Sequence, residues 1–109
     1  MHGRLSLANG NPGFRIWIVG TKRILGVAEF PPEEPLMPSK LRELALGEQF
    51  VFADFTVVPL SKEEEGVMRM VRVIRAEQTV ITDGSLKFIR RISERIEEEN
   101  SFRFEVRQK

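Results

Sequence analysis

The clearest hydrophobic pattern of the chain lies between residues 14 and 30. Two runs rich in β-branched and aromatic residues flank Gly20 and Thr21, a pattern typical of a β-hairpin with a two-residue turn. Gly20 can adopt the positive φ that such a turn requires. The first run is apolar on both of its faces, which favours a sheet that is covered on both sides or closed on itself. The implied hairpin register pairs Phe14 with Val27, Ile16 with Leu25, and Trp17 with Ile24.

Three further segments are expected to be strands. Residues 4–8 alternate between apolar and polar positions, as in a short half-buried strand. Residues 48–60 are predicted to be a central strand with one continuous apolar face. Residues 67–76 fit a helix or a strand, but their β-branched residues favour a bulged strand that continues to Thr82. Gly26, inside the hairpin, indicates a bend of the kind found where a sheet curls into a barrel. The continuous face of the central strand comprises Val51, Ala53, Phe55 and Val57.

A short helix is predicted after the proline-rich residues 31–38, which we expect to form a stiff, extended loop without regular structure. Ser39 is the expected N-cap of this helix, and Gly47 is expected to follow its end.

A second helix is predicted from about residue 86 to residue 99. Four apolar residues recur there at three- and four-residue spacing, which is typical of a helix with one buried stripe. After it, residues 101–107 alternate and predict an edge strand with a charged outer face. The alternative for this last segment is a tail that is ordered only against a partner chain. The residues of the stripe are Leu86, Ile89, Ile92 and Ile96.

The first five predicted strands, with a helix between the third and fourth, resemble in their order the five-stranded Greek-key barrel known as the OB-fold. We therefore expect one mainly β (α+β) domain, with a curled, barrel-like five-stranded sheet in residues 1–82. Residues 83–109 are expected to add a C-terminal helix and an edge strand. An open α+β sheet with helices on one face is the alternative.

The composition is that of a folded domain, with 109 residues, 41% of them hydrophobic and 30% charged. The chain has no cysteine, so disulfides and thiolate metal sites are excluded. Its apolar runs are too short to cross a membrane, and its first residues do not have the pattern of a signal peptide. We therefore expect a cytoplasmic protein with no membrane partner.

Few residues offer catalytic or metal-binding chemistry. The one histidine, His2, is expected to be exposed at a mobile terminus, which leaves no Ser-His-Asp arrangement and no zinc site. We expect no cofactor and no metal. Asp54 is the one carboxylate in an otherwise apolar strand, and a catalytic role for it is one hypothesis. The simpler alternatives are an ion pair with Arg69 or Arg72, or exposure at a bulge. We therefore expect a protein that is not an enzyme.

The net charge is only +1, but residues 1–28 and 67–76 contain no acidic residue. If these segments lie on one side of the sheet, their cations surround Trp17 and offer both phosphate attraction and a stacking surface. The alternative is that Trp17 belongs to the core and the arginines pair with glutamates. The predicted ligand-binding residues are Arg15, Trp17, Lys22, Arg23, Arg69 and Arg72.

Two functions are compatible with these features. The first is a small binding module whose ligand is a protein or a single-stranded nucleic acid. The second is a homodimeric structural or interaction protein that assembles through the C-terminal helix and strand. The predicted subunit contact of the second consists of Leu86, Ile89, Ile92, Phe102 and Phe104.

Overall fold

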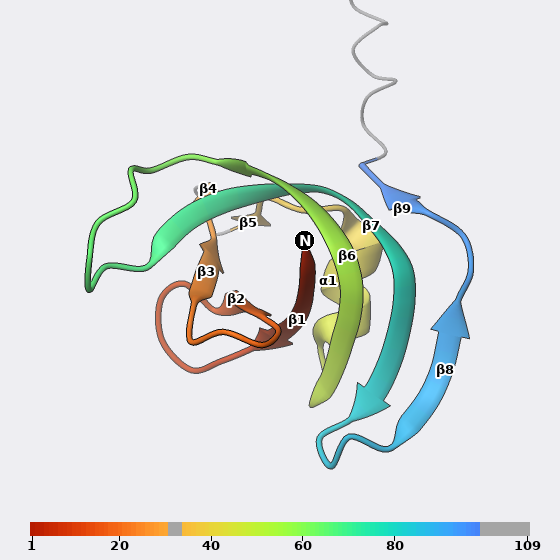
Figure 1. Ribbon diagram of the computed structural model, residues 1–109. Helices are drawn as coiled ribbons and strands as arrows, with labels where there is room; N and C mark the ends of the chain where they lie inside the picture. The colour runs from red at the N-terminus through yellow and green to blue at the C-terminus, as the bar shows by residue number, and fades with distance from the viewer. Residues whose placement is uncertain (31–33, 99–109) are drawn as a thin grey trace, which may run out of the picture.

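Five strands close on one another into a barrel in the computed structural model, which describes residues 1–30 and 34–98 (Figure 1). Strand β1 pairs antiparallel with β2 and β6, β2 pairs with β3, and β6 pairs with β7. Strand β3 then closes the barrel by pairing parallel to β7. The predicted five-stranded, mainly β core is therefore confirmed. The barrel strands are β1 (His2–Leu7), β2 (Phe14–Ile18), β3 (Ile24–Val27), β6 (Gln49–Pro59) and β7 (Arg69–Asp83).

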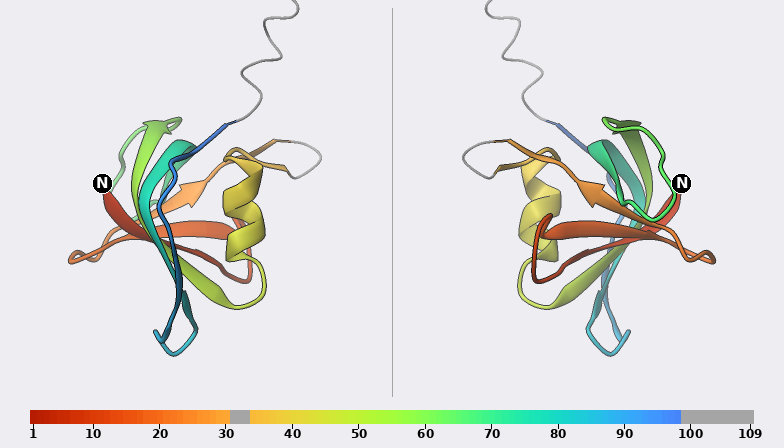
Figure 2. Two further views of the ribbon diagram at one scale, coloured as in Figure 1. Left: turned by 90° about the vertical axis from the view of Figure 1, so that its right-hand side faces the viewer. Right: turned by 90° about the vertical axis from the view of Figure 1, so that its left-hand side faces the viewer.

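The other elements lie around this barrel (Figure 2). Strands β4 (Glu29–Phe30) and β5 (Glu34–Pro35) form a small separate ladder. The proline-rich segment therefore contains a two-residue strand where none was expected. Strands β8 (Phe88–Ile92) and β9 (Ile96–Glu97) extend the sheet beyond the barrel, because both pair with the far part of β7.

The core is formed by the inward-facing residues of the barrel strands. Leu5 pairs with Ile16 on one side and with Val51 on the other, and all three side chains are fully buried. The predicted inner face of β6 is confirmed, because Val51, Ala53 and Phe55 are buried and Val57 packs against the core. This burial of apolar surface is the main favourable contribution to folding.

The helix α1 (Ser39–Ala45) lies between β3 and β6 in the chain, as predicted, and buries Leu41 and Leu44 against the barrel. Ser39 is the first helical residue and not the N-cap. Pro38 holds that position, and its carbonyl accepts the amides of Leu41 and Arg42. Within the described part of the chain, no helix has the length and apolar character needed to cross a bilayer.

The central hairpin has the predicted register for Ile16–Leu25 and Trp17–Ile24. Its ladder stops at Arg15, so the predicted pair of Phe14 with Val27 is not part of it, although both side chains are buried. The loop is longer than the predicted two residues, because the Ile18 amide bonds to the Arg23 carbonyl and leaves residues 19–22 between them. Gly20 has the expected positive φ, 86°.

Strand β7 confirms the strand interpretation of residues 67–76, although it begins only at Arg69. It runs without interruption to Asp83, past the predicted end at Thr82. A bulge lies where Phe52 pairs with Val80 but Asp54 pairs with Glu77. Such bulges bend a strand and let one long strand contribute to two parts of a sheet.

The predicted helix of residues 86–99 is wrong, because this segment forms β8 and β9. The Asp83 carboxylate accepts the amides of Ser85 and Lys87, and Leu86 has a φ of 69°, so the chain makes a tight turn instead of a first helical turn. Leu86 and Ile89 are 59% and 45% exposed, so the expected buried stripe does not form. The predicted strand at residues 101–107 lies outside the described residues.

Candidate functional site

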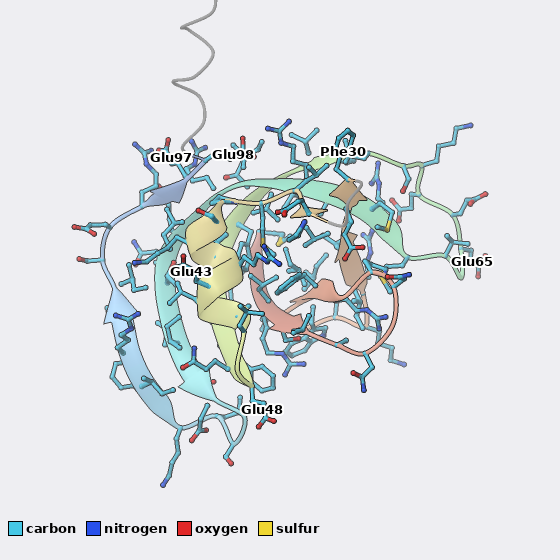
Figure 3. All side chains as sticks on the ribbon, turned by 180° about the vertical axis from the view of Figure 1, so that it is seen from behind. Phe30, Glu43, Glu48, Glu65, Glu97 and Glu98 are labelled. Carbon is cyan, nitrogen blue, oxygen red and sulfur yellow. The ribbon has the colours of Figure 1, made fainter. Side chains whose placement is uncertain are left out.

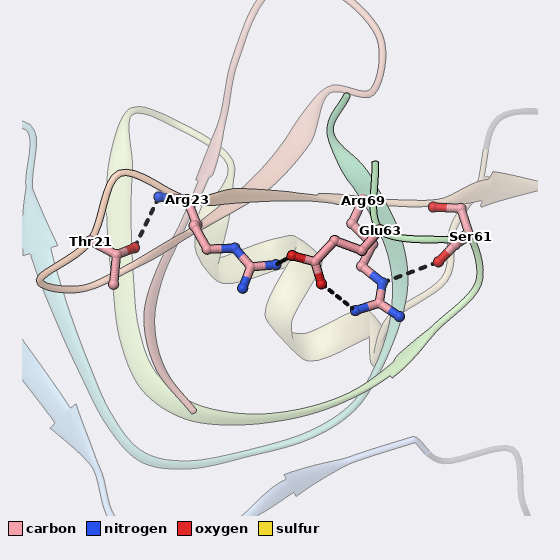
Figure 4. A network of polar contacts seen from close by, with 5 residues as sticks. All are labelled: Thr21, Arg23, Ser61, Glu63 and Arg69. Atoms are coloured by element: carbon pink, nitrogen blue, oxygen red, sulfur yellow. Dashed lines mark hydrogen bonds and ion pairs between the residues drawn. The ribbon is translucent and has the colours of Figure 1, made fainter. Parts of the chain in front are cut away.

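Two of the predicted binding residues, Arg23 and Arg69, come together around one acid (Figure 4). The Glu63 carboxylate lies 3.2 Å from Arg23 and 3.4 Å from Arg69. Arg69 also donates to the Ser61 carbonyl, and the Thr21 hydroxyl accepts the Arg23 amide. A single carboxylate of the β6–β7 loop therefore pairs with both cations, as the glutamate-pairing alternative expected.

Arg72 is also paired. Its guanidinium makes two hydrogen bonds to the Glu98 carboxylate, at 2.7 and 3.1 Å. This bonding raises the pKa of Arg72 above its usual value, and desolvation opposes the rise only in part. Arg72 is therefore a positive charge held against a glutamate and not a free cation of a basic patch.

Of the two simpler alternatives for Asp54, the ion pair with Arg69 or Arg72 does not form, and exposure at a bulge is confirmed. Asp54 lies exposed beside the bulge, and its Oδ1 is 3.1 Å from Nδ1 of His2. His2 is exposed as expected, but it belongs to β1 and pairs with Asp54 across the ladder. The side chain of Asp54 is 53% exposed, so Asp54 is not a carboxylate buried in the apolar strand.

The remaining predicted residues lie on β2 and in the loop that follows it. Arg15 donates to the Pro12 carbonyl at 3.0 Å and so holds the β1–β2 loop. Lys22 is exposed in the β2–β3 loop. Trp17 is half-buried on the outer face of β2, and its indole N–H donates to the Thr21 carbonyl at 2.7 Å. Of the six predicted residues, Lys22, Arg23 and Arg69 therefore line one hollow together with Glu63, whereas Arg72 is held by Glu98.

The structure places Trp17 in a different group of side chains. Trp17 pairs with Arg4, Arg4 with Phe52, Phe52 with Val80, and Val80 with Arg91, across five strands from β2 to β8. Directly paired residues project from the same face of a sheet, so these side chains form one outer row. A neighbouring outer row runs from Phe50 through Thr82 to Phe88. We call the charged and aromatic members of the two rows the arginine–aromatic face: Arg4, Trp17, Phe50, Phe52, Phe88 and Arg91.

Arg4 is the centre of this face. Its guanidinium carbon lies 5.0 Å from the ring centroid of Trp17 and 4.5 Å from that of Phe50. Its Nε is buried without a hydrogen-bond partner, and neither Arg4 nor Arg91 makes an ion pair with any residue the structure describes. The next row is acidic, because it contains the pair Asp54 and Glu77, and it marks one boundary of the face.

Sequence reasoning identified only Trp17 from this group. The alternation of residues 48–60 places Phe50 and Phe52 on one face, but only the pairing of β1 with β6 brings them beside Arg4. These strands are separated by more than forty residues, as the partners His2 and Asp54 show. No local pattern in the chain signals that contact.

Two hollows flank this region. One, of about 540 Å³, adjoins Phe50 and is lined by the β1–β2 loop, the end of α1 and the β7–β8 turn. The other, of about 500 Å³, lies between α1 and the β8–β9 segment. In residues 1–30 and 34–98, no three histidine, aspartate or glutamate side chains gather as a metal ion requires.

Comparison of the chain with protein-family models, with curated proteins and with solved structures finds no match.

Proposed function

We propose that this chain is a small, non-enzymatic binding module that takes single-stranded nucleic acid on the arginine–aromatic face. The observation that carries the proposal is the position of the Arg4 guanidinium between the rings of Trp17 and Phe50, in an outer row without an acidic residue. Because the chain contains no cysteine, we also propose that it works in the reducing environment of the cytoplasm.

The chemistry of the face fits this ligand. Arg4 and Arg91 lie three strands apart in one row, about 14 Å at the usual strand spacing, so they can attract two separate phosphates of one strand. The aromatic rings between and beside them offer stacking surfaces to unpaired bases, and such stacking tolerates different sequences. The outer side of a barrel is convex, so it suits the splayed bases of a single strand better than a rigid duplex.

The connectivity of the barrel gives support by analogy. Its strand order, with a helix between the third and fourth barrel strands and a parallel closure, resembles that of the OB-fold, a fold that binds oligonucleotides on one side of its barrel. Fold alone does not establish function. On the corresponding side of this barrel Arg23 and Arg69 both pair with Glu63, so we place the ligand on the arginine–aromatic face instead.

The proposal is tested by titrating the protein with a single-stranded oligothymidylate at low salt. Trp17 is the one tryptophan of the chain, so its fluorescence reports stacking at the face directly. We expect quenching, and an affinity that falls as salt rises. Phe88→Ala should weaken binding about tenfold, because one stacking partner is lost.

Phe30→Ala is the matched control. Phe30 and Phe88 are both 63% exposed, but Phe30 lies on β4, far from β8 (Figure 3). Its replacement should leave the affinity unchanged. A protein that shows no quenching and no binding at low salt, or an equal loss in the two variants, contradicts the proposal and points to a structural or protein-binding role for the face.

A further inference from the structure

Strand β8 forms one end of the sheet. Among the described residues its only neighbour is β7, so its other edge presents backbone N–H and C=O groups without strand partners. Phe88 and Ile89 on β8 are exposed, as is Leu86 in the turn before it. A paired or covered edge is the usual state of a strand with exposed apolar side chains, because such an edge is a template for another strand.

The surroundings of this edge are positively charged. Lys40, Arg90, Arg91 and Arg95 line the 500 Å³ hollow between α1 and the β8–β9 segment, together with the apolar Ile92 and Ile96. Of the two acids in its wall, Glu97 is bound to Arg95 at 2.6 Å and Glu94 makes no ion pair within the described residues, so four cations face two acids. Lys40 and Arg90 make no ion pair within the described residues. The hollow therefore has cations available for a ligand.

We propose that β8 accepts an extended, acidic segment of a partner protein as an additional strand. Main-chain hydrogen bonds to the free edge provide the affinity, and alternate side chains of the added strand provide the specificity. Acidic side chains on one face of that strand would enter the hollow and meet Lys40 and Arg90. Arg90 pairs with Ile81, so it lies on the face of the sheet opposite to Arg91.

A second copy of the chain fits this edge less well. Antiparallel pairing of β8 with itself would bring Arg90 and Arg91 close to the same two residues of the other copy. Like charges on opposed strands destabilise a sheet. The charge of the edge therefore favours an acidic partner over the self-association that the sequence also suggested, although Ile89 and Ile92 of the predicted subunit contact do lie on β8.

The probe for this proposal is a short synthetic peptide that alternates Val and Glu and carries a fluorophore. We expect it to bind, with slower amide hydrogen exchange in residues 88–92. A Val–Lys peptide should bind at least about tenfold more weakly, because like charges then oppose one another. A Val–Glu peptide with proline in place of alternate valines keeps its charge but lacks the donors that strand pairing needs, so it should also bind about tenfold more weakly.

The variant Arg90→Glu should reduce peptide binding by about tenfold or more. Lys62→Glu makes the same charge change in the exposed β6–β7 loop and should have no such effect. Equal binding of the Val–Lys or proline-containing peptide overturns the proposal, as does a Lys62→Glu protein that loses as much affinity as Arg90→Glu. A dimer in sedimentation that resists excess Val–Glu peptide also overturns it, in favour of a second copy.

This result is separate from the oligonucleotide experiment. The two probes differ, and they address different faces of β8. The pairing shifts register between Ile81 and Thr82, so Arg90 pairs with the inward-facing Ile81 and Phe88 pairs with Thr82 of the outer row. If the peptide binds but the oligonucleotide does not quench Trp17 fluorescence, strand addition at β8 is supported and the nucleic-acid ligand is rejected. If the oligonucleotide quenches the fluorescence but the peptide does not bind, strand addition at β8 is rejected and the nucleic-acid ligand is supported.

Discussion

Arg4 is the central residue of the proposed binding face. Its side chain rises from β1, whose two neighbours, β2 and β6, supply the rings of Trp17 and Phe50. A guanidinium over an aromatic ring gains about 0.5–2 kcal/mol, depending on how far it is desolvated. The stacked position fixes a side chain that would otherwise be mobile. A fixed cation between two rings is prepared for a ligand that carries both a phosphate and a base.

Close packing under Arg4 depends on its neighbour Gly3, whose Cα faces the barrel interior. A Cβ at this position would lie 2.6 Å from Cγ2 of Ile16 and 3.2 Å from the Trp17 carbonyl oxygen. Gly3→Ala should therefore lower the free energy of unfolding by about 1–3 kcal/mol, the usual cost of overpacking a core. Urea denaturation measures this loss.

Gly84→Ala is the control for this substitution. The nearest atom to a Cβ at Gly84 is the Glu48 carbonyl oxygen at 3.8 Å, which is an ordinary contact. The control variant should unfold at the same urea concentration as the wild type or slightly above it. If both variants unfold at the same midpoint, the barrel is not packed as described around β1.

At the scale of the elements, the β7–β8 hairpin shows how turn chemistry decides between a helix and a strand. The spacing of the apolar residues from Leu86 onward fits a helix, and Asp83 is a common helix cap. The Asp83 carboxylate instead binds the amides of Ser85 and Lys87 at 2.8 and 2.9 Å, and the Asp83 amide donates to the Lys87 carbonyl. These bonds close a turn and direct the chain back along β7.

We expect Asp83→Ala to destabilise the protein by about 1–2 kcal/mol, the range found when a side chain that caps backbone amides is removed. Asp83→Asn keeps the accepting oxygen and should retain most of the stability. Thermal unfolding of the three proteins checks this. Equal loss in the two variants would mean that the charge of Asp83 matters and that its hydrogen bonds to the turn do not.

The strands were predictable where a single segment carries the information. Alternation located β1, β2, β3 and β6, and the β-branched residues of residues 67–76 identified β7. The length of the β2–β3 loop was not predictable, because the amide and hydroxyl of Thr21 both bond to the Ile18 carbonyl and widen the turn. The strands β8 and β9 were missed because their apolar residues also fit a helical spacing, and pairing with the free edge of β7 stabilises them as strands instead.

At the scale of the whole molecule, barrel closure determines the candidate site. The strand order was predictable from the succession of elements, and with it the barrel. The grouping of the cations was not predictable, because it depends on the register between strands that are far apart in the chain. Arg23 and Arg69 meet across the parallel β3–β7 contact, where both pair with Glu63, whereas Arg4 reaches Phe50 through the β1–β6 pairing.

The central claim is that a single strand of nucleic acid lies along the outer rows that cross the sheet from Trp17 to Arg91. Its most direct test is an NMR titration of the isotope-labelled protein with a single-stranded oligothymidylate at low salt. We predict chemical-shift changes that concentrate on the side-chain and backbone signals of four residues of the arginine–aromatic face: Arg4, Trp17, Phe52 and Arg91. The signals of Arg23 and Arg69 should not change. Shifts confined to Arg23, Arg69 and the β6–β7 loop, or no shifts at all, would contradict it.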